Sequence, residues 1–146
     1  MAFGGEEEVC LVDRLRADGL VIASLVAIEN ERIAGHILFS HLPVETPHGP
    51  LPAAALAPMA VLPDYQRRGI GGMFVRRGLE LCRERGQSAV LVVGHPEYYP
   101  RFGFSAAAAK ELRGPFSGDV WMALELVPGA LAGISGTVRY PEAFGL

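Results

Sequence analysis

The chain has 146 residues, half of them hydrophobic, with 18 glycines, 11 prolines and a formal net charge of −3 at pH 7. This length fits one domain, and the apolar share is that of a globular chain rather than a disordered one. The slightly negative charge excludes a broad electrostatic attraction to nucleic acid, so a nucleic-acid partner is not expected.

Neither a leader nor a membrane segment is evident. The first residues contain Glu6, Glu7 and Glu8 without a basic stretch or an apolar run, so no signal peptide is expected. Residues 46–63 lack charged side chains, but their prolines exclude a membrane helix. The cysteines have no paired spacing, so neither a disulfide framework nor a metal site is expected. These features together predict a cytoplasmic protein.

The first half of the chain predicts one helix, a hairpin and a third strand. Apolar residues at helical spacing indicate the helix, and Asp18-Gly19 ends it. Two apolar, β-branched stretches on either side of Glu29-Asn30-Glu31 indicate an antiparallel hairpin. The predicted elements are a helix over 5–17, strands over 20–28, 33–42 and 54–62, and a proline-rich loop over 43–53.

The second half alternates a helix with strands. The helix over 70–85 has a predicted inner face of Ile70, Phe74, Leu81 and Cys82, with Met73 beside them and Gly78 on the same face to allow close packing on a sheet. An apolar strand over 88–94 is expected to be central and buried. A short helix at Pro96, a loop over 105–118, and strands over 120–127 and 137–140 follow. The pattern predicts an α+β fold with a mixed sheet, in one domain of residues 1–146.

A glycine-rich turn separates the strand over 54–62 from the helix over 70–85. It holds Arg67 and Arg68, followed by Gly69, Gly71 and Gly72. The first N–H groups of a helix have no partner within the helix and attract anions, and glycines allow a phosphate to approach the backbone. The turn therefore predicts a diphosphate site. It lacks the lysine of a P-loop and the third glycine of a Rossmann fingerprint.

Two motifs carry a resemblance to a known family. The pattern Gln66-x-x-Gly69-x-Gly71 resembles the acyl-CoA diphosphate loop of the Gcn5-related N-acetyltransferase (GNAT) superfamily. Downstream, residues 95–104 read His-Pro-Glu-Tyr-Tyr-Pro-Arg-Phe-Gly-Phe, which places Tyr99 four residues before Gly103. The order and separation of the motifs resemble the family over about residues 20–140. The chain is most similar to predicted bacterial acetyltransferases that carry this run.

The resemblance implies how acetyl-CoA would bind. Family members insert its pantetheine arm between two splayed strands, which here would be residues 56–62 and 88–94. The Met59 N–H would lie near the thioester carbonyl and stabilise an oxyanion. The implied binding residues are Met59, Ala60, Val61, Gln66, Arg67, Arg68, Gly69, Ile70, Gly71 and Gly72.

The resemblance also implies the activity: transfer of an acetyl group from acetyl-CoA to a primary amine by direct attack in a ternary complex. Tyr99 would protonate the leaving thiolate, whereas Tyr98 is expected to pack. The base could be Glu45, His95 or a bound water. The acceptor, a small molecule or a protein, is not identified by the sequence.

The chain departs from the family pattern at one point, and two alternative functions are considered. Family members usually begin with a strand and a helix before the region of Glu6, so the resemblance implies that this first strand and helix are absent here. An uncovered sheet edge would then favour a homodimer. The alternative function is a catalytically inactive acyl-CoA-binding or sensing domain. An oxidoreductase or nucleotide-binding fold is disfavoured by the incomplete Rossmann fingerprint.

Overall fold

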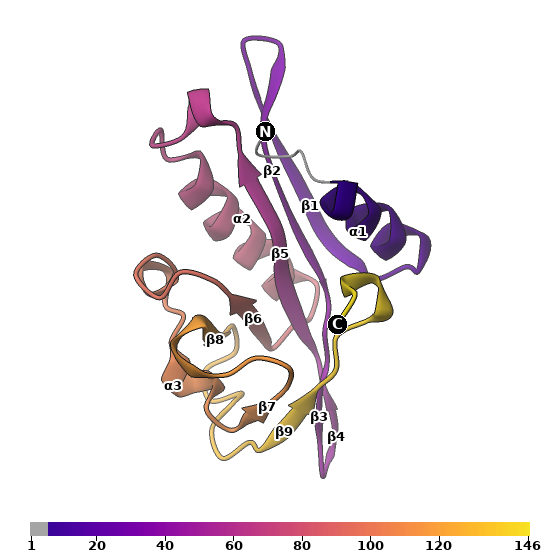
Figure 1. Ribbon diagram of the computed structural model, residues 1–146. Helices are drawn as coiled ribbons and strands as arrows, with labels where there is room; N and C mark the ends of the chain where they lie inside the picture. Colours follow the sequence, from indigo (N-terminus) through magenta and orange to yellow (C-terminus); the bar gives the residue numbers. More distant parts are fainter. Residues whose placement is uncertain (1–5) are drawn as a thin grey trace.

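The computed structural model describes residues 6–146 (Figure 1). Its helices are α1 (Glu6–Ala17), α2 (Ile70–Glu84) and α3 (Ala106–Ala109). The strands are β1 (Val21–Glu29), β2 (Arg32–His41), β3 (Val44–Thr46), β4 (Gly49–Leu51), β5 (Ala53–Val61), β6 (Ala89–Val93), β7 (Leu112–Arg113), β8 (Trp121–Glu125) and β9 (Gly136–Val138). Short 3₁₀ turns are η1 (Pro63–Tyr65), η2 (Tyr99–Phe102), η3 (Gly118–Val120) and η4 (Glu142–Phe144).

The main sheet has five strands in the order β1-β2-β5-β6-β8. Its neighbours pair antiparallel except for β5 and β6, which pair parallel. A second sheet, in the order β4-β3-β9-β7, lies at one end of the molecule (Figure 1). The α+β fold with a mixed sheet that the sequence predicts is therefore confirmed.

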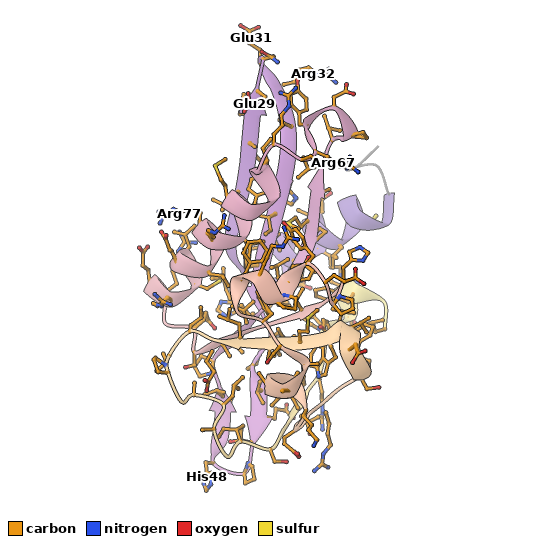
Figure 2. The ribbon with its side chains drawn as sticks, turned by 90° about the vertical axis from the view of Figure 1, so that its left-hand side faces the viewer. Glu29, Glu31, Arg32, His48, Arg67 and Arg77 are labelled. Carbon is orange, nitrogen blue, oxygen red and sulfur yellow. The ribbon has the colours of Figure 1, made fainter. Side chains whose placement is uncertain are left out.

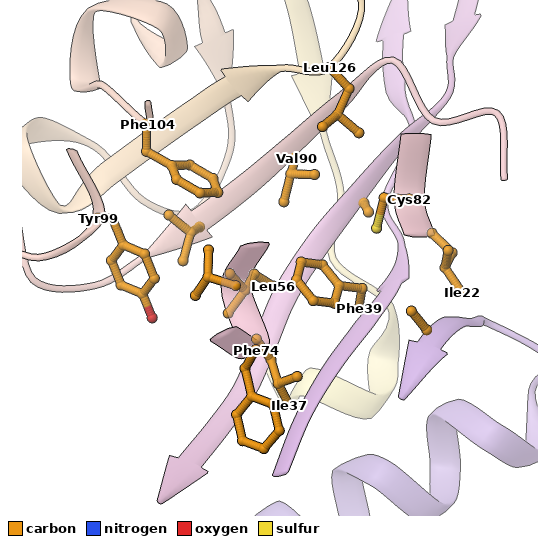
Figure 3. Packing of buried hydrophobic residues seen from close by; sticks show 14 of the residues in the cluster. Ile22, Ile37, Phe39, Leu56, Phe74, Cys82, Val90, Tyr99, Phe104 and Leu126 are labelled. Atoms are coloured by element: carbon orange, nitrogen blue, oxygen red, sulfur yellow. The ribbon is translucent and has the colours of Figure 1, made fainter. Parts of the chain in front are cut away.

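Helix α2 packs on one face of β1, β2 and β5. Gly78 makes this close approach possible, because a Cβ at that position would overlap the ring of Phe39, which is fully buried. Figure 3 shows part of the resulting core, in which Phe39 of β2 and Phe74 of α2 belong to one buried cluster. Helix α1 lies on the other side of the β1–β2 hairpin (Figure 1), where the Arg16 Nη2 donates to Ser24 Oγ at 3.2 Å.

A second hydrophobic cluster joins the main sheet to the smaller one. Trp121 lies at its centre, 3 % exposed, and its indole N–H donates to the Leu112 carbonyl oxygen at 3.0 Å. The buried members of this cluster are Leu42, Val44, Ala53, Ala55, Ala89, Leu91, Ala109, Leu112, Trp121, Ala123 and Val138. The cluster includes residues of both β5 and β6 and packs against the part of the main sheet where these two strands pair.

The structure corrects three sequence predictions. The predicted loop over 43–53 forms the β3–β4 hairpin, and the predicted loop over 105–118 contains α3 and β7. β3 pairs with its neighbour β4 and with the distant β9, and β7 pairs with β9. These strands have only two or three residues each, so no local pattern indicates them. Met73, predicted to lie beside the inner face, is 62 % exposed, whereas Val75 on the other side of Phe74 is fully buried. The buried residues of α2 recur every fourth position, at Ile70, Phe74, Gly78 and Cys82, and the buried face widens on the side of Val75 rather than on the side of Met73.

The predicted hairpin, the strand before the glycines and the helix after them are confirmed within one or two residues. Within residues 6–146, no helix combines the length and the apolar character needed to cross a membrane.

Candidate active site

Strands β5 and β6 separate to form a cleft. They pair only over Ala53–Ala55 and Ala89–Leu91. Beyond this point β5 stays with β2 and β6 stays with β8. The cleft between them has a volume of about 860 Å³ and extends to the start of α2. The predicted splayed strands are therefore present.

Backbone groups of β5 face into this cleft. The Leu62 N–H donates to the Ala34 oxygen of β2 at 2.8 Å. Because successive strand residues alternate, the backbone groups of Met59 and Val61 point the other way, into the cleft. The Gln66 side-chain amide reaches Val61 from that side and donates to its carbonyl oxygen at 2.9 Å. An extended ligand in the cleft could pair with β5 as an added strand would.

A bulge in β5 sets this direction. The register with β2 moves from Phe39–Leu56 to Ile37–Met59, so β5 carries one residue more than its partner. Odd-numbered residues of β5 face β2 before the bulge, and even-numbered residues face it afterwards. Without the extra residue, the backbone N–H groups of Met59 and Val61 would donate to β2, and they would not be available in the cleft.

The glycine loop lies at the open end of the cleft. Arg67 and Gly69 both have left-handed backbone, with φ of 64° and 80°. Such alternation turns successive N–H groups toward one point and forms an anion-binding concavity. No side chain caps α2 at Gly69, so the first N–H groups of the helix remain available. This geometry agrees with the predicted diphosphate site.

The structure places eight of the ten predicted binding residues in the lining of the cleft: Met59, Ala60, Val61, Gln66, Arg67, Gly69, Gly71 and Gly72. Two side chains point elsewhere. Ile70 is 3 % exposed and belongs to the core under α2. The Arg68 guanidinium lies over the Tyr65 ring, 5.3 Å from its centre. Ile70 can therefore offer only its backbone N–H group to a ligand at the loop, whereas the exposed Arg68 keeps a positive charge beside the loop.

Tyr99 lines the cleft from the β6 side. Its ring covers Gly94, where a Cβ would overlap it, and meets Phe104 edge-on at 5.7 Å. Figure 3 shows its hydroxyl pointing from η2 toward the space beside β5. Burial, and to a smaller extent the neighbouring Tyr98, raises the pKa of Tyr99 to about 12. The phenol is therefore fully protonated near neutral pH.

Tyr98 approaches the glycine loop instead. A Cβ on Gly71 would lie 2.8 Å from the Tyr98 hydroxyl oxygen, so this tyrosine reaches the first turn of α2. Burial raises its pKa, and the charges of Arg101 and Arg76 oppose that rise. The predicted packing role is thus accompanied by a position beside the predicted phosphate site.

The two candidate bases lie in different places. His95 lines the cleft directly after β6, and its carbonyl oxygen accepts from the Tyr98 N–H at 3.1 Å. Glu45 lies in β3 of the second sheet, where its carboxylate is 3.6 Å from Arg139 Nε. Glu45 is not among the residues that line the cleft, so the structure does not support it as a base there.

The lining of the cleft also includes residues that sequence reasoning did not select, among them Arg76, Arg101 and Phe102. Arg76 follows Gly72 by four residues, so helical spacing could have placed it on the same face as the loop. Among the described residues, no group of three or more His, Cys, Asp or Glu is arranged to hold a metal ion.

Comparison with known proteins identifies relatives along the whole chain. The chain is 36 % identical over 146 residues to the uncharacterized N-acetyltransferase YhbS of Escherichia coli K12, covering 98 % of this chain and 86 % of that one. It is 39 % identical over 109 residues to the uncharacterized N-acetyltransferase YjhQ of the same strain, covering 73 % of this chain and 60 % of that one.

Solved structures show the same similarity. The structure of Escherichia coli YhbS in complex with CoA superposes with a TM-score of 0.87 at 35 % identity, covering 99 % of this chain and 81 % of that one. A GNAT family acetyltransferase from Brucella melitensis in complex with acetyl-CoA gives 0.74 at 34 % identity, covering 99 % and 82 %. A family model described as an acetyltransferase (GNAT) domain matches residues 2–107. The chain therefore belongs to the GNAT family of acetyltransferases.

Proposed function

We propose that this protein transfers an acetyl group from acetyl-CoA to a primary amine of an as yet unidentified acceptor, by direct attack in a ternary complex. The observation that carries the proposal is the cleft between β5 and β6, which has inward-facing backbone groups along one wall and an anion-binding loop at its end. The two similar structures bound to CoA and acetyl-CoA support the same cosubstrate.

The binding roles follow from the position of each group. The Met59 and Val61 backbone would pair with the amide groups of the pantetheine arm. The loop from Gln66 to Gly72 would hold the diphosphate, through its N–H groups and the charges of Arg67 and Arg68. These assignments use the free N–H groups at the start of α2, whose dipoles favour an anion.

In the proposed reaction, the amine nitrogen attacks the thioester carbonyl after losing its proton. The Met59 N–H stabilises the negative charge that develops on the carbonyl oxygen. When the C–S bond breaks, the Tyr99 hydroxyl donates a proton to the thiolate and regains one from solvent. His95, or a water beside it, accepts the proton of the amine, because His95 is the candidate base that lines the cleft. The products are an amide and free CoA.

Replacing Tyr99 by Phe tests the catalytic part of the proposal. The ring packing on Gly94 and Phe104 is retained, so the affinity for acetyl-CoA measured by calorimetry should change less than about twofold. The loss of one positioned proton donor should lower kcat by about 10²-fold or more. A wild-type protein that binds acetyl-CoA but acetylates none of a broad panel of amines would instead indicate a binding or sensing domain.

Replacing Gly71 by Glu tests the binding loop. A carboxylate at the start of α2 would occupy the predicted phosphate position, so acetyl-CoA binding should be lost. Gly71→Ala is the matched control, because its Cβ meets the Tyr98 hydroxyl at 2.8 Å without adding charge. Gly71→Ala should weaken binding far less than Gly71→Glu. Unchanged affinity in the Glu variant would contradict the loop assignment.

We also propose that residues 1–146 act as one acetyltransferase domain and that the protein is cytoplasmic. Within the described residues, β1 pairs on one side only, and Val26, Ile28 and Ile33 near the tip of its hairpin are more than half exposed. Charged Glu29, Glu31 and Arg32 surround that tip (Figure 2). A homodimer through this edge is proposed, and a monomer by sedimentation at micromolar concentration would contradict it.

A further inference from the structure

Two arginines and two aromatic side chains alternate beside the glycine loop. The Arg101 guanidinium lies over the Tyr98 ring, 4.8 Å from its centre. Tyr98 meets Phe102 edge-on at 5.3 Å, and the Arg76 guanidinium lies over Phe102 at 5.2 Å. We call Arg101, Tyr98, Phe102 and Arg76 the arginine–aromatic ladder. All four residues line the cleft: Arg76 comes from α2, Arg101 and Phe102 from η2, and Tyr98 directly precedes η2.

The ladder carries positive charge without an acidic partner. Among the described residues, the arginines in ion pairs are Arg14, Arg77 and Arg139. The lining of the cleft contains no Asp or Glu, whereas it includes Arg67 as well as the two ladder arginines. A guanidinium that stacks on a ring through its face keeps its N–H edge free for an anion. The ladder therefore has the composition of an anion site.

The ladder also adjoins the predicted diphosphate site without being part of it. Arg76 follows Gly72 by one helical turn, and its side chain turns back toward the start of α2. A Cβ on Gly72 would lie 3.0 Å from Arg76 Nη1, so the glycine leaves room for the guanidinium. At the other end of the ladder, the Tyr98 hydroxyl reaches Gly71. Two candidate anion sites are thus adjacent, one built from backbone N–H groups and one from guanidinium groups.

We propose that the ladder binds the 3′-phosphate on the ribose of CoA, and that it makes the protein select CoA over dephospho-CoA. The inference rests on the proposed cosubstrate. CoA carries two separate phosphate groups, a diphosphate and a 3′-monophosphate. The glycine loop accounts for the diphosphate, whereas the monophosphate is a dianion near neutral pH and matches two guanidinium groups. The partly exposed rings of Tyr98 and Phe102, and the guanidinium planes stacked on them, add flat surfaces on which a purine can stack.

Calorimetric titration with CoA and with dephospho-CoA tests this assignment, because the two ligands differ only in the 3′-phosphate. The wild-type protein should bind CoA at least about tenfold more tightly than dephospho-CoA. Arg76→Gln and Arg101→Gln should each weaken CoA binding by about tenfold and leave dephospho-CoA within about twofold. Arg76 and Arg101 are both exposed, so these substitutions should not prevent folding, which circular dichroism will verify.

Arg77→Gln is the matched control. Arg77 is the next residue on α2, but it points outward from the helix (Figure 2) and is not among the residues that line the cleft. Its Nη1 lies 2.8 Å from Glu80 Oε2. Its replacement should change neither affinity. Equal binding of the two ligands by the wild type, or an equal loss for both ligands in the ladder variants, would overturn the inference.

The inference and the proposed function can fail separately. A protein that distinguishes CoA from dephospho-CoA but acetylates no amine would overturn the catalytic proposal and support the ladder assignment. A protein that acetylates amines equally well with acetyl-CoA and acetyl-dephospho-CoA as donors, and binds CoA and dephospho-CoA equally, would support the proposed function and overturn the ladder assignment.

Discussion

The ionisation of Tyr99 offers a direct test of the environment that the structure gives it. The ring is 7 % exposed, and its pKa is raised to about 12 from the ordinary value of about 10. At pH 10 an ordinary phenol is about half ionised, whereas Tyr99 should be ionised to about 1 %. The phenol should therefore remain a proton donor across the whole pH range in which acetyl transfer can be assayed.

The absorbance of phenolate near 295 nm measures this directly. The chain has 4 tyrosines, so the titration of the Tyr99→Phe variant is subtracted from that of the wild type. The difference should stay flat to about pH 11 and then rise. Tyr98→Phe is the control. The Tyr99 difference curve measured in this background should stay well above pH 10, because burial, the larger cause of the raised pKa, remains in place. A difference curve with a midpoint near pH 10 would refute the argument that Tyr99 is buried beside the cleft.

The same shift links Tyr99 to stability. The folded state holds the Tyr99 proton more tightly than the unfolded chain does, so the unfolded chain loses it first as the pH rises above 10. The contribution of Tyr99 to the free energy of unfolding is therefore complete below pH 10 and is lost as the pH rises through about 12. The Tyr99→Phe variant should lose less stability over that interval than the wild type.

Two further predictions concern the packing and the charges of the fold. Gly78→Ala should lower the free energy of unfolding by about 1–3 kcal/mol in urea titrations, because overpacking against Phe39 outweighs a helix-propensity gain of about 1 kcal/mol. In a Phe39→Leu background the same change should be neutral or stabilising, and an equal loss in both backgrounds would refute the contact. Burial, and then the charge of Arg16, lowers the pKa of His36 from 6.5, so acid protonates the unfolded chain first and stability falls below pH 6.5. His36→Gln should reduce the loss of thermal stability between pH 7.5 and 5, and an unchanged loss would contradict this assignment.

Local patterns in the sequence were sufficient for the elements that form the cleft. The β1–β2 hairpin, β5, the glycine turn, α2 and β6 each have a signal within about 15 residues, namely alternation, a turn or helical spacing. The spacing of the two motifs predicts Tyr99 beside the cleft, and Tyr99 lines it. These elements are consecutive in the chain, which is why local reasoning succeeded for them.

Long-range pairing and side-chain stacking had no such signal. Val44 of β3 pairs with Val138 of β9, and neither short strand has an alternation long enough to recognise. Glu45 became a candidate base only because its loop precedes β5 in sequence, yet β3 carries it into the second sheet. The ladder forms only because η2 lies against α2. In the sequence, Arg76 and Arg101 are separated by the rest of α2, by β6 and by a turn. The sequence indicates each residue alone but not their stacking.

The bulge in β5 limits how this strand can change in length during evolution. Loss of the extra residue between Leu56 and Met59 would exchange the two sets of backbone groups beyond it, so the N–H groups now available to a ligand would bond to β2. Side chains would exchange faces as well, and Met59 would leave the core under α2. A single insertion or deletion here therefore alters binding and packing together, whereas related chains should conserve the number of residues between Ala55 and the glycine loop even where the side chains differ.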